Sequence, residues 1–417
     1  MNQPVIIGFS NPKDSSLRTA LELMSAEGLI TASNSKKYLI LPGLCDVHVH
    51  FREPGFSYKE TIATGSRSAA AGGFTDVMTM PNLNPVPDCK ENLDIQLELI
   101  KRDAVIGVHP YASITEGERG ARLSRMEELS PYVRAFSDDG RGVQDGELML
   151  EAMKRVKELD RVLAAHCEQL SLLCGGYIHD GEYAKRHSHL GISSESEYAQ
   201  IARDLELAAK TGVKYHVCHI SAAKSVELIR QAKRSGVDVS CETAPHYLFF
   251  CEDELREDGS FKMNPPLRSA SDREALLEGA ADGTIDMIAT DHAPHSSEEK
   301  SRGLRDSLMG VVGLETAFAA SYSMLVENGI VSLERLYELL CKNPRERFGI
   351  EPCGAAVFEL GVPYTVIPER FVTKGRATPF DGATLGARCI MTVIDDKAVY
   401  KAPGLSGCED NNDFWRI

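Results

Sequence analysis

Short runs of apolar and β-branched residues alternate along the middle of the chain with longer stretches of helical periodicity. Eight such runs occur, at 45–50, 75–80, 104–113, 133–137, 162–166, 215–220, 237–242 and 286–290. The stretches between them, such as 146–159, 194–212, 222–236 and 271–283, have one apolar and one polar helical face. Wholly apolar strands indicate a parallel sheet covered by helices, and eight strand–helix units predict an α/β fold, a closed (β/α)8 TIM-type barrel.

The two ends of the chain follow a different pattern. Residues 1–42 finish in the strand-like run KYLILPG, and residues 354–417 are rich in Val, Ile, Gly and Pro. Two more helical stretches, 313–329 and 332–349, precede the second of these segments. We therefore predict a barrel domain over 43–353, including its C-terminal helices, and a small flanking β-rich domain formed jointly by 1–42 and 354–417.

The composition of the chain excludes some classes of binding partner and some cellular locations. A formal net charge of -15 argues against a nucleic-acid or anionic-membrane surface, but not against an anionic small-molecule substrate. Eleven cysteines, irregularly spaced from Cys45 to Cys408, are typical of reduced thiols in the cytoplasm. The sequence shows no basic leader followed by an apolar core and no run of about 18 apolar residues, so neither secretion nor membrane insertion is expected.

Imidazole and carboxylate side chains stand at the C-terminal ends of the predicted strands, where barrel enzymes place their active groups. These side chains are His48, His50, Asp138, Asp139, His166, His219 and Asp291. A single histidine at a strand end is more often a packing group than a ligand, and DDG is more often a turn. Four histidines together with acids at one barrel face instead predict a zinc-type site, and two adjacent ions would need a bridging anionic ligand.

The other candidate groups are separated by their positions. His295 follows Asp291 by four residues, above the predicted site, and is a candidate for contacting substrate. His246 ends the seventh strand, and its interpretation as a group supporting the ligands or as a packing group stays open. His109, His187, His189 and His216 are interpreted as surface or packing groups. The polar segment 296–310 fits either a lid that excludes water or a surface loop.

Seven segments carry a resemblance to a known family. They are PGLCDVHVHFREPG (42–55), TMPNLNP (79–85), AFSDDG (135–140), AAHCE (164–168), YHVCHIS (215–221), MNPPLR (263–268) and ATDHAPHS (289–296). Their order and spacing between about residues 40 and 350 resemble the amidohydrolase superfamily and, within it, the bacterial-type dihydroorotases.

The resemblance implies a role for each matching residue. Two Zn²⁺ ions are expected, one held by His48, His50 and Asp291 and the other by His166 and His219. Asp139 would bridge them in place of the carboxylated lysine of many amidohydrolases, with Asp138 as the alternative. The residues implied in substrate binding are His50, Arg52, Asn82 and His295, with Arg52 pairing with the ring carboxylate, and Asn264, Met309 and Gly310 near the ring amides. Leu308-Met309-Gly310 replaces the Pro-Phe-Gly that is usual in this family.

The implied activity is the reversible, zinc-dependent cyclisation of N-carbamoyl-L-aspartate to L-dihydroorotate in pyrimidine biosynthesis. A metal-bridging hydroxide would attack the ring carbonyl, with Asp291 as general base and then general acid. A homo-oligomer and an association with aspartate transcarbamoylase are the partners considered. The alternatives are another cyclic amidohydrolase, such as a hydantoinase, dihydropyrimidinase or allantoinase, and an inactive homologue that only supports a partner enzyme. Arg52 and the DDG motif favour dihydroorotase, and the retained ligands argue against an inactive homologue.

Overall fold

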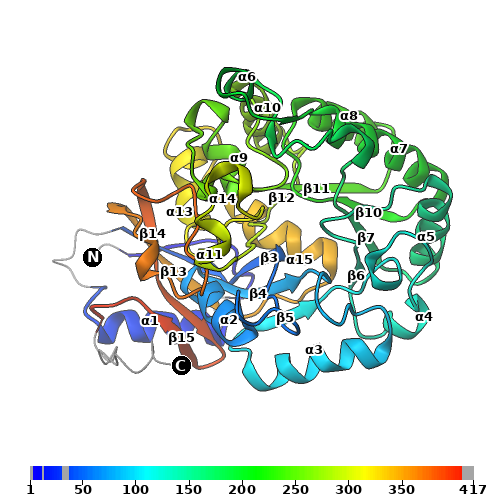
Figure 1. Cartoon of the computed structure of the whole chain (residues 1–417). Helices are drawn as coiled ribbons and strands as arrows, with labels where there is room; N and C mark the ends of the chain where they lie inside the picture. The colour runs from blue at the N-terminus through cyan, green and yellow to red at the C-terminus, as the bar shows by residue number, and fades with distance from the viewer. Residues whose placement is uncertain (1–2, 12–13, 31–36, 406–417) are drawn as a thin grey trace.

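The computed structural model describes residues 3–11, 14–30 and 37–405, and its centre is a set of short parallel strands (Figure 1). The eight strands are β3 (Leu44–Val49), β4 (Phe74–Thr79), β5 (Gly107–Pro110), β6 (Ala135–Phe136), β7 (Val162–Ala165), β10 (Lys214–Val217), β11 (Val239–Thr243) and β12 (Met287–Ile288). They pair in two parallel groups, β3-β4-β5 and β6-β7-β10-β11-β12. Parallel bridges from Ala112 to Phe136 and from Val49 to His292 connect the two groups at both edges, so the pairing order is cyclic.

Helices lie outside these strands, as Figure 1 shows for α3, α5, α7 and α8. The longer ones are α2 (Ile62–Ala71), α3 (Lys90–Asp103), α5 (Gly146–Glu158), α7 (Glu195–Thr211), α8 (Ala223–Arg234) and α10 (Ala270–Asp282). Shorter helices are α4 (Met126–Leu129), α6 (Glu182–His187), α9 (Pro245–Phe249), α11 (Ser297–Lys300) and α12 (Gly303–Asp306), and a small parallel pair joins β8 (Ile178–His179) to β9 (Gly191–Ile192). The predicted helix 313–329 is realised as α13 (Ala317–Ser321) followed by a π-helical turn, and 332–349 as α14 (Leu333–Tyr337), a π-helical turn and α15 (Asn343–Phe348).

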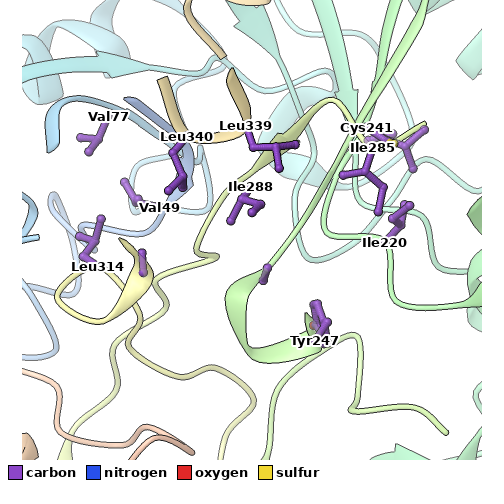
Figure 2. Close-up of a cluster of buried hydrophobic side chains, with 14 of the residues drawn as sticks. Val49, Val77, Ile220, Cys241, Tyr247, Ile285, Ile288, Leu314, Leu339 and Leu340 are labelled. Carbon is purple, nitrogen blue, oxygen red and sulfur yellow. The ribbon is translucent and has the colours of Figure 1, made fainter. Parts of the chain in front are cut away.

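The core has an inner and an outer layer because successive side chains of a strand point to opposite faces. In β7, Val162 and Ala164 belong to the cluster inside the strands, whereas Leu163 and Ala165 belong to the larger cluster between strands and helices. Figure 2 shows part of this outer cluster, which is drawn from strands and covering helices alike: Val49, Val77, Ile220, Cys241, Tyr247, Ile285, Ile288, Leu314, Leu339 and Leu340. Packing on both faces explains why most side chains of the strands are apolar.

The two ends of the chain meet in one five-stranded sheet beside the parallel strands (Figure 1). Its order is β1 (Val5–Ile6), β2 (Lys37–Pro42), β13 (Ala355–Thr365), β14 (Thr384–Ile394) and β15 (Lys397–Lys401), with β2 antiparallel to β13. The helix α1 (Ser15–Ala26) also packs there through Leu17, Ala20 and Met24. The prediction of a β-rich segment over 1–42 did not include this helix. The sequence does contain two signals for it, the N-cap residue Asp14 and apolar residues at helical spacing.

Two further sequence expectations concern cysteines and membranes. The ten cysteines of the described residues are free thiols, and Cys408 lies outside those residues. Within the described part of the chain, none of the helices combines the length and apolar character that a membrane span needs.

Candidate metal centre

Asp139, which follows β6, lies between two pairs of histidines. Its Oδ1 is 3.3 Å from Nε2 of His48, and its Oδ2 is 3.5 Å from Nε2 of His50. The same Oδ1 lies 3.7 Å from Nδ1 of His166 and 3.6 Å from Nε2 of His219. One carboxylate therefore faces both pairs, which is the position that a ligand shared by two ions needs.

The remaining donor atoms have the spacing of ligands around a common ion. Oδ1 of Asp291 is 3.1 Å from Nε2 of His50 and 3.5 Å from Nε2 of His48. Nδ1 of His166 lies 3.0 Å from Nε2 of His219. Two ligands bound tetrahedrally to one zinc ion are about 3.4 Å apart, as follows from bond lengths of about 2.1 Å. The separations of donor atoms therefore fit zinc coordination.

Two central atoms of this cluster have no hydrogen-bond partner among the described residues. They are Nε2 of His48, which is fully buried, and Oδ1 of Asp139. Buried polar atoms are nearly always hydrogen-bonded, so these two atoms are suited to act as ligands that would hold a cation. Burial alone would raise the pKa of Asp139, but His48 and the neighbouring histidines hold it well below its usual value, which keeps the carboxylate ionised.

Asp138, the alternative bridging residue, points elsewhere. Its Oδ1 accepts hydrogen bonds from the backbone N–H groups of Ile114, at 2.7 Å, and Thr115, at 3.0 Å. Its Oδ2 accepts another from the Thr115 hydroxyl group. The first aspartate of DDG therefore ties the loop after β5 to the end of β6, while the second faces the histidines.

Glu242, at the end of β11, is a site residue that the sequence reading did not single out. Its Oε1 is 2.6 Å from Nδ1 of His48, and its Oε2 is 3.0 Å from Nε2 of His216. His216, interpreted from the sequence as a surface or packing group, is fully buried and also bonds to Ser240. A carboxylate behind a ligating histidine fixes the ring orientation and the tautomer. The only signal in the sequence was an acidic residue in a strand whose other residues are uncharged.

Backbone strain is concentrated at the same place. Four of the eight non-glycine residues with positive φ among the described residues are Arg52 (57°), Glu118 (54°), His219 (31°) and Asp291 (46°). Side chains with a Cβ rarely adopt this left-handed conformation, and such residues tend to cluster at functional sites. The strands therefore end in sharp turns that direct His219 and Asp291 towards the centre.

A cavity of about 330 Å³ opens beside Asp139. Its walls include Arg52, Asn82, Lys59, Glu118 and Arg141. The predicted anchors of the substrate carboxylate are thus divided: Arg52 and Asn82 line this cavity, whereas His295 is not among the lining residues and lies behind Arg52.

Hydrogen bonds hold these predicted anchors in place. Arg52 donates from Nε to the Pro294 carbonyl oxygen at 3.2 Å, and its guanidinium lies 3.5 Å from Nε2 of His295. Asn82 Oδ1 is 2.9 Å from Nδ1 of His50, so the amide also sets the orientation of that ring. Asn82 therefore contacts the histidine cluster directly, whereas Arg52 is held by the segment after β12 that carries Pro294 and His295.

The other predicted substrate contacts lie outside the cavity walls. Asn264 donates to Glu168 Oε1 at 2.9 Å, and Glu168 Oε2 is 3.7 Å from His166. The Met309 carbonyl accepts from His295 at 2.8 Å, and the Gly310 N–H donates to the Lys262 carbonyl at 3.0 Å. His246 is buried, and burial lowers its pKa to about 4, so its ring is neutral.

Several solved structures of hydantoinases and dihydropyrimidinases have a similar fold. The L-hydantoinase (dihydropyrimidinase) from Arthrobacter aurescens superposes with a TM-score of 0.78 and 24% identity, covering 89% of this chain and 88% of that one. The dihydropyrimidinase from Brevibacillus agri gives 0.75 and 20%, covering 89% and 88%. At these identities the likeness concerns the fold, which this chain shares with the hydantoinase group.

Sequence comparison identifies the family. The profile of Dihydro-orotase-like proteins matches residues 37–225. A dihydroorotase from Fusobacterium nucleatum is 48% identical over 375 residues, covering 88% of each chain. A dihydroorotase from Geobacillus sp. is 45% identical over 403 residues, covering 91% of this chain and 94% of that one. The chain belongs to the dihydroorotase family.

Proposed function

We propose that this chain is a zinc-dependent dihydroorotase that interconverts N-carbamoyl-L-aspartate and L-dihydroorotate, a ring-forming step of pyrimidine biosynthesis. Relatives that are 44% to 48% identical over most of the chain carry that name. The cyclic order of the eight parallel strands supports a (β/α)8 barrel as the scaffold.

The observation that carries the proposal is the position of Asp139 between two histidine pairs, beside a cavity that Arg52 lines. We assign His48, His50 and Asp291 to one zinc ion and His166 and His219 to a second, with Asp139 shared. Bound zinc would polarise the ring carbonyl and lower the pKa of the attacking water.

The chain's own residues would then bind the substrate and move its proton. Arg52 offers a planar fork of N–H donors that suits the carboxylate of dihydroorotate. Asp291 would accept a proton from water as the water oxygen adds to the ring carbonyl carbon, and deliver that proton to the ring nitrogen as the carbon–nitrogen bond breaks. In the reverse direction the ureido nitrogen attacks the side-chain carboxyl group, and water leaves.

The deciding experiment is a paired assay on purified protein of known metal content. Ring opening of L-dihydroorotate is followed by ultraviolet absorbance beside hydantoin, dihydrouracil and allantoin. Selective turnover of dihydroorotate that a chelator abolishes supports the proposal. Preference for another of the four rings, with zinc bound, assigns the chain to a sibling activity. Inactivity on all four with little metal bound would favour the inactive, partner-supporting alternative.

Partners and compartment stay predictions. A homo-oligomer, an association with aspartate transcarbamoylase and a cytoplasmic location rest on the family and on composition. The division into a barrel over 43–353 and a flanking domain is supported by the sheet that joins β2 to β13.

A further inference from the structure

The segment 296–310, which was predicted as either a lid or a surface loop, is held by a buried lysine. Lys300, the last residue of α11, is 7% exposed. Its ammonium group donates to three backbone carbonyl oxygens, those of Lys262 at 3.0 Å, Leu308 at 2.8 Å and Gly310 at 2.7 Å. An ammonium has three N–H donors, so each one is used.

No ion pair involves Lys300 within the described residues, so the carbonyl oxygens alone compensate its burial. A buried charge is costly unless hydrogen bonds replace its hydration. Burial and the nearby Lys262 lower the pKa of Lys300 to about 7, but a neutral amine has only two N–H groups, so the three acceptors favour the protonated form. Because the buried ammonium group of Lys300 bonds only to backbone carbonyl oxygens, its effect is to hold those backbone segments in place.

The three carbonyl groups belong to segments that also carry predicted substrate contacts. Lys262 lies two residues before Asn264, and its carbonyl also accepts from the Gly310 N–H at 3.0 Å. The Met309 carbonyl accepts from His295 at 2.8 Å. A Cβ on Gly310 would lie 2.7 Å from the Ala293 carbonyl oxygen, so this backbone packs tightly beside the turn after β12.

We propose that Lys300 is a positioning residue whose ammonium group fixes the backbone at Met309–Gly310 relative to Asn264 and His295, and so sets the positions of the groups that are predicted to contact the substrate ring. This inference rests on the proposed function. It makes 296–310 a pinned segment and not an opening lid. Ser307 supports the arrangement because its hydroxyl group donates to the Lys300 carbonyl at 2.9 Å.

The test compares Lys300→Met, which keeps the length of the side chain without its donors, with Lys224→Met, an exposed lysine paired with Glu227 on α8. Lys300→Met should raise KM for dihydroorotate about tenfold or more and change kcat less than about threefold, because lost positioning weakens binding. Lys300→Arg, which keeps the charge, should recover part of the loss. Lys224→Met should leave both constants unchanged.

Hydrogen exchange provides a readout that does not require substrate. Amides of residues 300–312 should exchange faster in Lys300→Met, with zinc content unchanged. If Lys300→Met fails to fold, Ser307→Ala is the milder variant, with a KM increase of about threefold and the same exchange pattern. Unchanged exchange, or an unchanged KM in an active enzyme, overturns the inference. If the wild type does not turn over dihydroorotate but Lys300→Met still exchanges faster, Lys300 fixes the backbone and the proposed function is wrong.

Discussion

Replacing Glu242 should weaken zinc binding although this residue is not assigned as a ligand. Its two oxygens bond to His48 at 2.6 Å and His216 at 3.0 Å, in a place where the carboxylate is 1% exposed. Loss of such a supporting group lowers metal affinity by about 10- to 100-fold, equivalent to about 1.4 to 2.7 kcal/mol. Glu242→Gln keeps one acceptor oxygen for His48, but it removes the charge and replaces the oxygen that faces His216 with an N–H donor, so we expect about tenfold. Glu242→Ala leaves Nδ1 of His48 unpaired, so we expect about 100-fold.

The assay is competition for zinc against a chromophoric chelator, with thermal unfolding measured in parallel. The matched control is Glu359→Gln in β13, where an equally buried glutamate bonds to Arg388 in the flanking sheet. Both variants remove one buried carboxylate, but only the change at Glu242 touches the histidine cluster. Equal zinc affinity for Glu242→Gln, Glu359→Gln and the wild type would refute the idea that Glu242 orients His48.

Three further predictions concern the assigned residues. Asp139→Asn should lose at least one zinc ion by metal analysis. Asp138→Asn should keep both ions and instead lower the free energy of unfolding by about 2 kcal/mol, because its bonds to the backbone are weakened. The opposite pattern would exchange the roles of the two residues. Asp291→Ala should abolish turnover in both directions, and substantial residual rate with metal bound would remove it as the proton carrier. Arg52→Met should raise KM for dihydroorotate by about 10- to 100-fold, the equivalent of one lost charge-assisted contact, without a comparable loss of zinc; an unchanged KM would place the substrate carboxylate elsewhere.

The hydrophobic pattern of the sequence predicted an element best where burial alone determines that pattern. The strands at 45–50 and 162–166 were clear because packing on both faces makes their side chains apolar, apart from Asp46 and the candidate ligands His48, His50 and His166. The run at 104–113 shortened to β5, Gly107–Pro110, and 133–137 to β6, Ala135–Phe136, since pairing with neighbours sets where a strand ends. The 12-residue helix α1 was missed because the prediction for residues 1–42 rested on the strand-like run at the end of that segment.

The candidate ligands could be proposed from sequence because each follows a strand, and parallel strands bring their C-terminal ends to one face. Which aspartate of DDG faces the histidines could not be decided that way. Asp138 and Asp139 are adjacent and chemically identical. They are distinguished by the bonds from Ile114 and Thr115 to Asp138 and by the histidines that surround Asp139. Position along the chain limits which face a side chain can occupy, but not which neighbour it meets.

Three features could therefore be predicted without a structure: the alternation of strands and helices, the family, and the set of imidazole and carboxylate groups at one end of the strands. Those features depend on local periodicity and on residue type. The contacts between groups far apart in the chain depend instead on the tertiary packing: Glu242 bonds to His48, and Lys300 bonds to the carbonyl oxygen of Lys262. Each of these polar groups is buried, and its partner is fixed by how the strands and loops pack in three dimensions, which no local pattern encodes.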